Sequence, residues 1–227
     1  IARGLISFLR TKNVKSVAIA AASGGFPQAN AGAFAKAARD AGMTVTAQEV
    51  IAAGATDLAP LLDKLKAGAP DELLVMPGGT TAAFFKAYEA SGLKIPVSGR
   101  FDLAAALGVV SPAFRQAGGL AGMTSIAVFA PLIDKPGVKA FVASYEIHYG
   151  LVPTQRSFFV YEATYLAVDA IRKAHTDKPA AIEKALKTTR MASRLGVTYA
   201  PDDHNHAHTP LFVAGLRDGT PAVVATE

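Results

Sequence analysis

Short apolar segments alternate with helix-like segments over residues 1–127, through joints of only a few residues. Repeated strand–helix units with joints this short favour a parallel sheet with right-handed crossovers and helices on both faces. The sequence therefore predicts a doubly wound α/β lobe. The expected strands cover residues 17–22, 44–51, 73–76, 95–98 and 120–126, and the first helix, from about 29 to 41, ends at Gly42.

Residues 128–192 are almost entirely helix-like. One helix carries an apolar stripe that includes Phe141 and Tyr145, and the next, around residues 157–174, is apolar on most of its faces. Such a helix must be buried, yet this part has no strand-like segments to cover it. We therefore expect the first lobe, a missing N-terminal sheet or another chain to pack against it. The remaining residues, 193–227, hold two strand-like runs, at 196–199 and 211–216.

The composition excludes several classes of protein. Of the 227 residues, 51% are hydrophobic and 18% are charged, which excludes a disordered chain. There is no cysteine, so disulfide scaffolds, thiolate metal sites and a cysteine nucleophile are excluded. The net charge is +5, but the basic residues are scattered and not interleaved with aromatic residues, so we expect no nucleic acid partner. The common catalytic motifs are absent, and we expect neither an enzyme nor a cofactor.

Several short motifs occur in an order that one family shares. They are residues 26–28 (Phe-Pro-Gln), 54–57 (Gly-Ala-Thr-Asp), 65–71 (Leu-Lys-Ala-Gly-Ala-Pro-Asp), 91–96 (Ser-Gly-Leu-Lys-Ile-Pro), 141–145 (Phe-Val-Ala-Ser-Tyr), 149–150 (Tyr-Gly) and 161–163 (Tyr-Glu-Ala). With these motifs over nearly its whole length, the chain resembles the periplasmic substrate-binding proteins of the branched-chain amino acid (Leu/Ile/Val-type) ABC transporter family.

The resemblance implies a type I periplasmic binding protein-like fold, in which crossover strands join two doubly wound lobes and the ligand is held between them. The family's opening strand–helix–strand series is missing from this sequence, which fits the uncovered helices. We therefore expect a fragment or a truncated homologue: one complete ligand-binding lobe (1–127), the helical part of the other lobe (128–192), and crossover strands with a C-terminal return (193–227). A truncated chain would self-associate through its exposed apolar helices.

The resemblance also implies a function. The protein would be the solute-binding component of an ABC importer in the periplasm, with the transporter permease as its partner. It would bind a small polar or anionic molecule, either amino acid-like or an organic or aromatic acid, and the ligand would favour the closed form of the two lobes. Two alternatives stay open: the effector-sensing domain of a transcription regulator with the same fold, and a doubly wound enzyme.

Ligands of open parallel sheets lie beyond the carboxyl ends of the strands, so the joints that follow the strands are candidate binding sites. The first joint contains Ser23, Gly24 and Phe26, and the family places a ligand-stacking aromatic residue at the position of Phe26. The alternative is a tight turn in which Phe26 packs locally. The second joint contains Gly79 and Thr80, where backbone N–H groups at a helix start would favour an anion. The alternative there is plain helix capping.

The third joint departs from the family pattern. Members that bind amino acids tend to carry an acidic residue directly after the glycine, whereas this sequence has Arg100. A guanidinium repels an ammonium group and can grip a carboxylate, so Arg100 indicates an organic acid as the ligand. Asp102 is either a substitute acidic partner or a neutralising neighbour in a surface Arg–Asp pair. Tyr161 starts a helix that lies near the cleft in the family, although core packing explains it equally well.

Three histidines alternate near the C-terminus: His204, His206 and His208. On a strand they would share one face and could bind a transition metal. The neighbouring Pro201 and Pro210 and the polar composition of the run indicate a loop instead. We therefore expect no metal site there.

Overall fold

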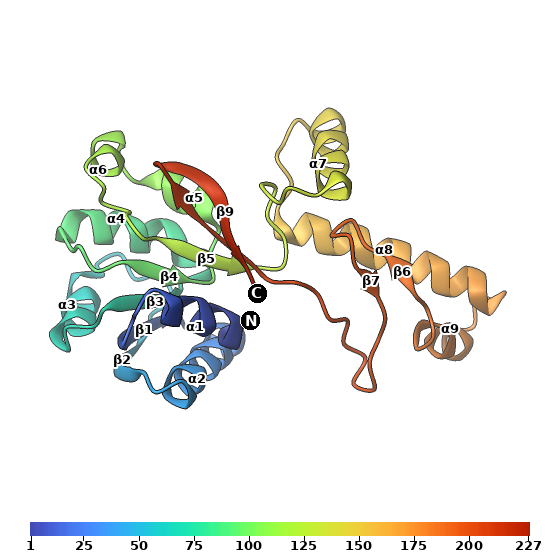
Figure 1. Ribbon diagram of the computed structural model, residues 1–227, viewed down its shortest axis with the longest axis horizontal. Coiled ribbons are helices and arrows are strands. Elements are labelled where there is room, and N and C mark those ends of the chain that lie inside the picture. Colours follow the sequence, from blue (N-terminus) through green and yellow to red (C-terminus); the bar gives the residue numbers. More distant parts are fainter. The chain divides into compact units, whose positions relative to one another are not determined.

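The computed structural model describes residues 1–227 and divides into two compact units, which are described separately (Figure 1). Unit 1 comprises residues 1–127 and 213–227, and unit 2 comprises residues 128–212. The expected third segment, 193–227, is therefore not one piece. It is divided because its last two strands, β8 (Phe212–Arg217) and β9 (Thr220–Thr226), extend the sheet of unit 1.

Unit 1 is built on a 7-stranded sheet with the strand order β2-β1-β3-β4-β5-β8-β9. The neighbours among the first five strands pair in parallel, whereas β8 and β9 are joined by a two-residue turn that permits only antiparallel neighbours. The doubly wound α/β fold predicted from the sequence is confirmed. The five parallel strands are β1 (Ser16–Ala22), β2 (Thr44–Ile51), β3 (Glu72–Met76), β4 (Val97–Gly99) and β5 (Thr124–Ala127).

Helices cover both faces of this sheet (Figure 1). On one face lie α1 (Ala2–Thr11) and α2 (Gly25–Asp40). On the other lie α3 (Ala59–Ala67), α4 (Thr81–Ser91), α5 (Leu103–Val109) and α6 (Pro112–Gln116), with the short 3₁₀ turn η1 (Gly78–Thr80) before α4. Successive strand residues point to opposite faces, so Ala18 and Ala20 join the core beneath α3–α5 while Ile19 faces α1 and α2.

Aromatic side chains of α4 fill the core between the sheet and α3–α6. Phe84 and Phe85 are fully buried, and the ring of Phe85 meets that of Phe101 edge-on at 5.1 Å between centroids. Tyr88 is also buried, and its hydroxyl donates to the carbonyl of Ile95 at 2.8 Å. The hydrogen bond lets a polar side chain contribute a large apolar surface to the core without leaving its hydroxyl unpaired.

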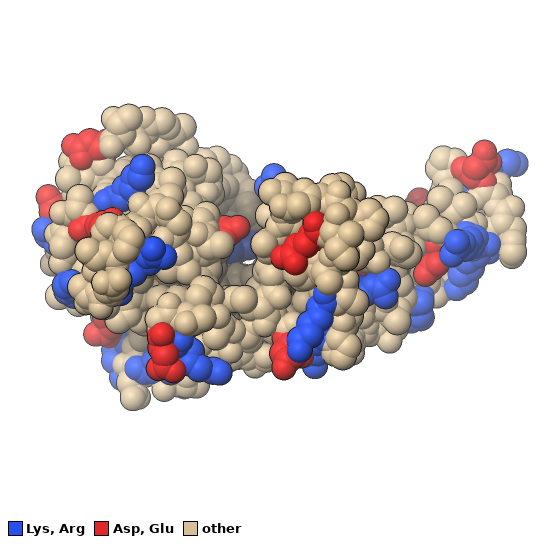
Figure 2. All heavy atoms as spheres, turned by 90° about the horizontal axis from the view of Figure 1, so that it is seen from above, with Lys and Arg blue, Asp and Glu red and all other residues tan.

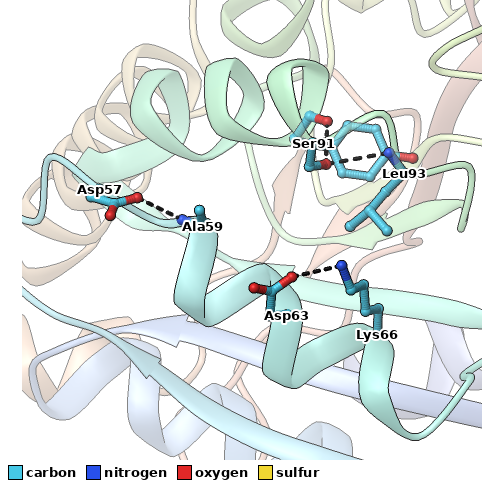
Figure 3. Close-up of polar contacts among 7 residues, drawn as sticks. Asp57, Ala59, Asp63, Lys66, Ser91 and Leu93 are labelled. Carbon is cyan, nitrogen blue, oxygen red and sulfur yellow. Dashed lines mark hydrogen bonds and ion pairs between the residues drawn. The ribbon is translucent and has the colours of Figure 1, made fainter.

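Local polar contacts fix the ends of α3 and α4 (Figure 3). The Asp57 carboxylate accepts from the backbone N–H of Ala59 at 2.9 Å, where α3 begins. At the end of α4, the Ser91 hydroxyl accepts from the N–H of Leu93 at 3.3 Å, and Gly92 takes the left-handed conformation that ends a helix. An exposed ion pair between Asp63 and Lys66, at 2.6 Å, links successive turns of α3 and contributes little to stability.

Several bounds differ from the predicted ones. Helix α2 begins at Gly25 rather than near residue 29, because Gly24 turns the chain at a φ of 115° and Pro27 is tolerated in a first helical turn. Strand β5 is shorter than the expected run 120–126. Strand β9 follows the turn at residues 218–219, where the sequence pattern predicts no strand.

Unit 2 contains three helices and one short antiparallel strand pair. Its core includes three phenyl rings: Phe129 stacks on Phe158 at 4.3 Å between centroids, and Phe141 meets both edge-on. The Gln155 side chain accepts from the N–H of Val128 at 2.8 Å and so ties the start of the long helix to the entering chain. The elements are α7 (Pro136–Tyr149), α8 (Gln155–Ala174), α9 (Pro179–Leu186), β6 (Met191–Ala192) and β7 (Thr198–Tyr199).

Helix α8 is only partly covered within unit 2. Its buried residues are Phe158, Glu162 and Ala170. Five of its apolar side chains are 36–63% exposed: Phe159, Val160, Tyr165, Val168 and Ile171. The sequence predicts that this face is covered from outside residues 128–192, and within unit 2 it is uncovered because the unit's only strands are the short pair β6 and β7. None of the helices, α8 included, combines the length and apolar character that crossing a bilayer requires.

Candidate functional site

The three candidate joints lie at one edge of the unit 1 sheet. β1 pairs with β3 up to Ala21 and Met76, and β3 pairs with β4 up to Val75 and Gly99, all in parallel. Parallel neighbours end at the same edge, so the joints that follow β1, β3 and β4 emerge side by side. After β1 the chain adds β2 on one side of that strand, and it then adds β3 and β4 on the other side. The switch point of the sheet therefore lies between β1 and β3, where doubly wound folds form ligand crevices.

The first and third joints meet through their side chains. The Arg100 guanidinium lies over the ring of Phe26, with 5.1 Å between its central carbon and the ring centroid. Its Nη1 donates to the side-chain oxygen of Asn30 at 3.0 Å, and the Asn30 amide donates to the backbone carbonyl of Phe26 at 2.8 Å. We call Phe26, Asn30 and Arg100 the Phe26–Arg100 cluster. The Phe26 side chain is 68% exposed, so the local packing considered from the sequence does not bury it.

Hydrogen bonds to the strands hold both joints in place. The Gln28 side-chain amide donates to the carbonyls of Ala21 and Ala22, at 3.1 and 2.9 Å, and so fixes the first turn of α2 against the end of β1. On the third joint, the Ser125 hydroxyl donates to the carbonyl of Phe101 at 2.6 Å and accepts from its N–H at 3.1 Å. These bonds position the backbone on either side of the Phe26–Arg100 cluster.

Arg100 is the only charged side chain of the cluster. Arg100 makes no ion pair. Partial burial lowers the pKa of its guanidinium, which still stays protonated because an arginine titrates far above neutral pH. Elsewhere the charges of both signs are interspersed over the face seen in Figure 2, which shows no continuous basic surface.

The second joint approaches the end of β1 closely. A Cβ atom added to Gly78 would lie 3.7 Å from the Cβ of Ala22. The Thr80 hydroxyl donates to the carbonyl of Pro77 at 2.7 Å, and that of Thr81 donates to Gly78 at 2.8 Å. Neither threonine caps α4 through its side chain, so the capping alternative does not describe this joint.

Asp102 does not pair with Arg100. Its carboxylate accepts from the N–H of Ala105 at 3.0 Å and caps α5. The surface Arg–Asp pair considered from the sequence is therefore not formed, because Asp102 serves the helix that follows it.

Replacing Asp102 by alanine is expected to destabilise unit 1 by about 1 kcal/mol, the usual effect of losing a helix cap. Urea unfolding of the two proteins measures the difference. The variant Asp102→Asn keeps an oxygen that can cap and should recover most of the loss. Equal stability of wild type and Asp102→Ala would contradict the capping role.

Tyr161 belongs to unit 2, on the first turns of α8. Its ring packs against Phe141 at 4.8 Å between centroids, and its hydroxyl accepts from the guanidinium of Arg194 at 2.9 Å. The backbone N–H of Arg194 in turn donates to the buried carboxylate of Glu162 at 3.1 Å. Tyr161 thus takes part in packing within unit 2, and its contact with a ligand stays a prediction.

The histidine run forms a loop organised by one carboxylate. Asp202 accepts from the backbone N–H groups of His204 and His206, at 2.9 and 2.8 Å, and lies 3.1 Å from the ring Nε2 of His208. These hydrogen bonds lower the pKa of Asp202. The structure has no group of three or more histidine and carboxylate side chains arranged to hold a metal ion.

Sequence reasoning missed Asn30, which links the two joints. Its position gave a usable signal, since it lies four residues after Phe26 and residues spaced this way share one face of a helix. The signal was lost because the pattern places the helix start near residue 29, after Phe26. The contact with Arg100 joins residues 70 apart in the chain and has no local signature.

The sequence matches a family model described as "Periplasmic binding protein" over residues 1–221. The chain therefore belongs to the periplasmic binding protein family. No curated protein matches it.

Solved structures share its fold. The chain is similar to a putative branched-chain amino acid ABC transporter protein from Rhodospirillum rubrum, with 25% identity and a TM-score of 0.74 over 98% of this chain and 64% of that one. A solute binding protein from Rhodopseudomonas palustris HaA2, in complex with p-hydroxybenzoic acid, shows 22% identity and a TM-score of 0.82, over 100% and 64%. A leucine binding protein from Thermotoga maritima shows 18% identity and a TM-score of 0.81, over 99% of this chain and 64% of that one.

The chain thus spans less than two thirds of the length of these structures. The predicted family and the type I periplasmic binding protein-like fold are confirmed. The uncovered face of α8 agrees with the absence of the family's opening strands from this sequence. Self-association through that face stays a prediction.

Proposed function

We propose that this chain is the solute-capturing part of the binding protein of an ABC importer, located in the periplasm and working with a transporter permease. Membership of the periplasmic binding protein family supports the binding role. The placement of three joints beside the switch point of the sheet supports the carboxyl edge of unit 1 as one wall of the binding site. This role requires no chemical step, because the ligand is released unchanged.

The ligand we propose is a small organic acid with an aromatic or apolar body. The observation that carries this proposal is the Arg100 guanidinium, which has no ion-pair partner and lies against the exposed ring of Phe26. Asn30 accepts a hydrogen bond only from Nη1 of Arg100, so the other N–H groups of the guanidinium remain for a carboxylate. The ring of Phe26 offers an apolar face for the body of the ligand.

An ordinary α-amino acid suits this edge less well. Its ammonium group would lie near the charge of Arg100, and the nearest candidate acid in the joint, Asp102, is used to cap α5. The p-hydroxybenzoic acid held by the similar Rhodopseudomonas protein belongs to the ligand class that we propose here. The Ser23 hydroxyl and the N–H groups around Gly24 and Gly79 would donate further hydrogen bonds. The Thr80 hydroxyl, whose proton is donated to Pro77, would accept one from a hydroxyl of the ligand.

Replacing Arg100 by glutamine tests this proposal. The variant should bind benzoate or p-hydroxybenzoate roughly 10- to 150-fold more weakly, the equivalent of one hydrogen bond between charged groups. Isothermal titration calorimetry on the full-length protein measures the change, with leucine as the competing ligand class.

The matched control is Arg115→Gln, because Arg115 is an exposed arginine of α6 in the same unit. It should leave acid binding unchanged. Equal affinity of wild type and Arg100→Gln for both acids, or a preference of the wild type for leucine over them, would overturn the proposed ligand class.

A further inference from the structure

Unit 1 has a cavity at the edge of the sheet opposite the Phe26–Arg100 cluster. Its volume is about 450 Å³, and it is lined by residues at the starts of β3 and β5, by the residue before β4, and by α1. Cavities of roughly 300–1,000 Å³ are typical of small-molecule sites. The carboxyl-edge site uses the other ends of the same strands, so the cavity is separate from it.

The walls of the cavity are mainly apolar. α1 contributes Phe8 and Leu9, the start of β5 is preceded by Met123, and the C-terminal strands contribute Leu216 and Val224. Such walls favour the apolar body of a ligand over water, because a water molecule beside them gains few hydrogen bonds.

The floor of the cavity is polar. The Glu72 Oε1 atom accepts from the Ser98 hydroxyl at 2.6 Å, and the Ser98 oxygen lies 2.5 Å from the Thr124 hydroxyl oxygen. Ser98 and Thr124 are paired neighbours on β4 and β5, and Glu72 and Thr124 both line the cavity. Glu72 itself is only 4% exposed.

One oxygen of Glu72 remains without a protein partner. The Oε2 atom of Glu72 makes no hydrogen bond. The only fully buried side-chain nitrogen or oxygen atom without a hydrogen-bond partner is Oε2 of Glu162. The Oε2 atom of Glu72 is therefore not enclosed by protein and faces the cavity. Glu72 also makes no ion pair.

The other charged or titratable groups near Glu72 do not neutralise it. Asp71 is a like charge that raises the pKa of Glu72, and Tyr88 is a neutral phenol whose own pKa is raised to about 12. Lys12, directly after α1, lines the cavity, and its ammonium lies over the ring of Phe8, 5.6 Å from the ring centroid. Burial raises the pKa of Glu72 to about 7, so the carboxyl is half ionised near neutral pH.

We propose that this cavity binds a small amphipathic primary amine, whose ammonium group donates to Glu72 and whose apolar body lies against Leu9, Met123 and Leu216. An anion would be repelled, because the lining carries two carboxyl groups, Glu72 and Asp71, against one ammonium group, Lys12. A purely apolar molecule would leave the carboxylate oxygen without a partner, which a site of this kind penalises. An amine supplies both the donor and the charge that the floor lacks.

Calorimetry with 2-phenylethylamine at pH 8 tests this proposal, with 2-phenylethanol as the uncharged match. The amine should bind saturably and at least roughly tenfold more tightly than the alcohol. At pH 6, where most of Glu72 is protonated, binding should be about tenfold weaker than at pH 8. The variant Glu72→Gln should bind the amine and the alcohol equally.

A second pair of variants keeps the test independent of the carboxyl group. Val224→Trp places a large side chain in the cavity and should abolish amine binding, whereas Val223→Trp, on the opposite face of β9, should not. Arg100→Gln and added benzoate should leave amine binding unchanged, which separates this site from the carboxyl-edge site. Failure of the amine to bind saturably at millimolar concentration, equal binding of the alcohol by the wild type, or full binding by Glu72→Gln would overturn the proposal.

Discussion

Replacing Gly99 by alanine is expected to destabilise unit 1 by about 3–5 kcal/mol, which is large for a single added methyl group. A Cβ atom at residue 99 would lie 1.9 Å from the carbonyl oxygen of Val75. The obstacle is backbone of the neighbouring strand, which cannot rotate away as a side chain could. β4 would have to separate from β3, and the hydrogen bond from the Arg100 N–H to Val75 O, now 3.0 Å long, would be lost.

The position of Gly99 makes this change functional as well as structural. It is the last residue of β4 and directly precedes Arg100. A displaced β4 end moves the guanidinium away from Phe26 and Asn30. We therefore expect the variant to lose acid binding even under conditions in which it remains folded.

Urea unfolding followed by circular dichroism measures the stability change, and Gly108→Ala is the matched control. A Cβ atom at Gly108, within α5, would meet nothing within 4 Å, so this variant should be stabilised by up to about 1 kcal/mol through helix propensity. A wild-type unfolding midpoint for Gly99→Ala would show that the β3–β4 contact is looser than described.

Local signals in the sequence were sufficient for most elements of unit 1. The expected strand 44–51 has the same bounds as β2, because its β-branched residues lie between clear breaks in the pattern. Gly42, the residue expected to end the first helix, lies just after α2, and its left-handed φ of 79° suits glycine. These features depend on residues close in the chain, which is why they can be predicted.

Features that depend on distant residues were not predictable in the same way. Strand β9 forms because β8 offers an unpaired edge, a condition that the short run after residues 218–219 does not reveal. The exposed face of α8 depends on what packs against it rather than on its own apolar pattern. In each case the local pattern is compatible with the structure but does not determine it.

The candidate site likewise has features that can be predicted from the sequence and features that cannot. Topology alone places the joints after β1, β3 and β4 at one edge, so the neighbourhood of Phe26, Gly79 and Arg100 follows from the strand order. The contact of Arg100 with Asn30 and the capping role of Asp102 need side-chain positions. The burial of Glu72 has no local signal, because an Asp-Glu pair before an apolar strand is typical of an exposed joint, whereas in the structure only Asp71 is exposed.

Raising the pH from 4.5 to 8 is expected to destabilise unit 1 by about 3 kcal/mol through Glu72 alone. Burial raises the pKa of this carboxyl from 4.5 to about 7 in the folded protein. Below pH 4.5 the group is protonated in both states and has no effect. Between pH 4.5 and 7 the unfolded chain has released the proton that the folded chain still binds, so stability falls as the pH rises. Above pH 7 both states are ionised and the full loss is present.

Glu72→Gln should abolish this dependence, because an amide keeps the neutral form at every pH and its oxygen can still accept from Ser98. The variant is expected to match the wild type at pH 4.5 and to exceed its stability by about 3 kcal/mol at pH 8, measured as free energies of unfolding in urea. Glu49→Gln is the control, since Glu49 pairs only with Lys64 at the surface and should change stability by less than about 1 kcal/mol. Two results would contradict this prediction: a wild type that is equally stable at pH 4.5 and 8, or a Glu72→Gln variant that is less stable than the wild type at pH 8. Either would show that the folded state stabilises the ionised carboxylate and that the cavity floor is better solvated than its burial implies.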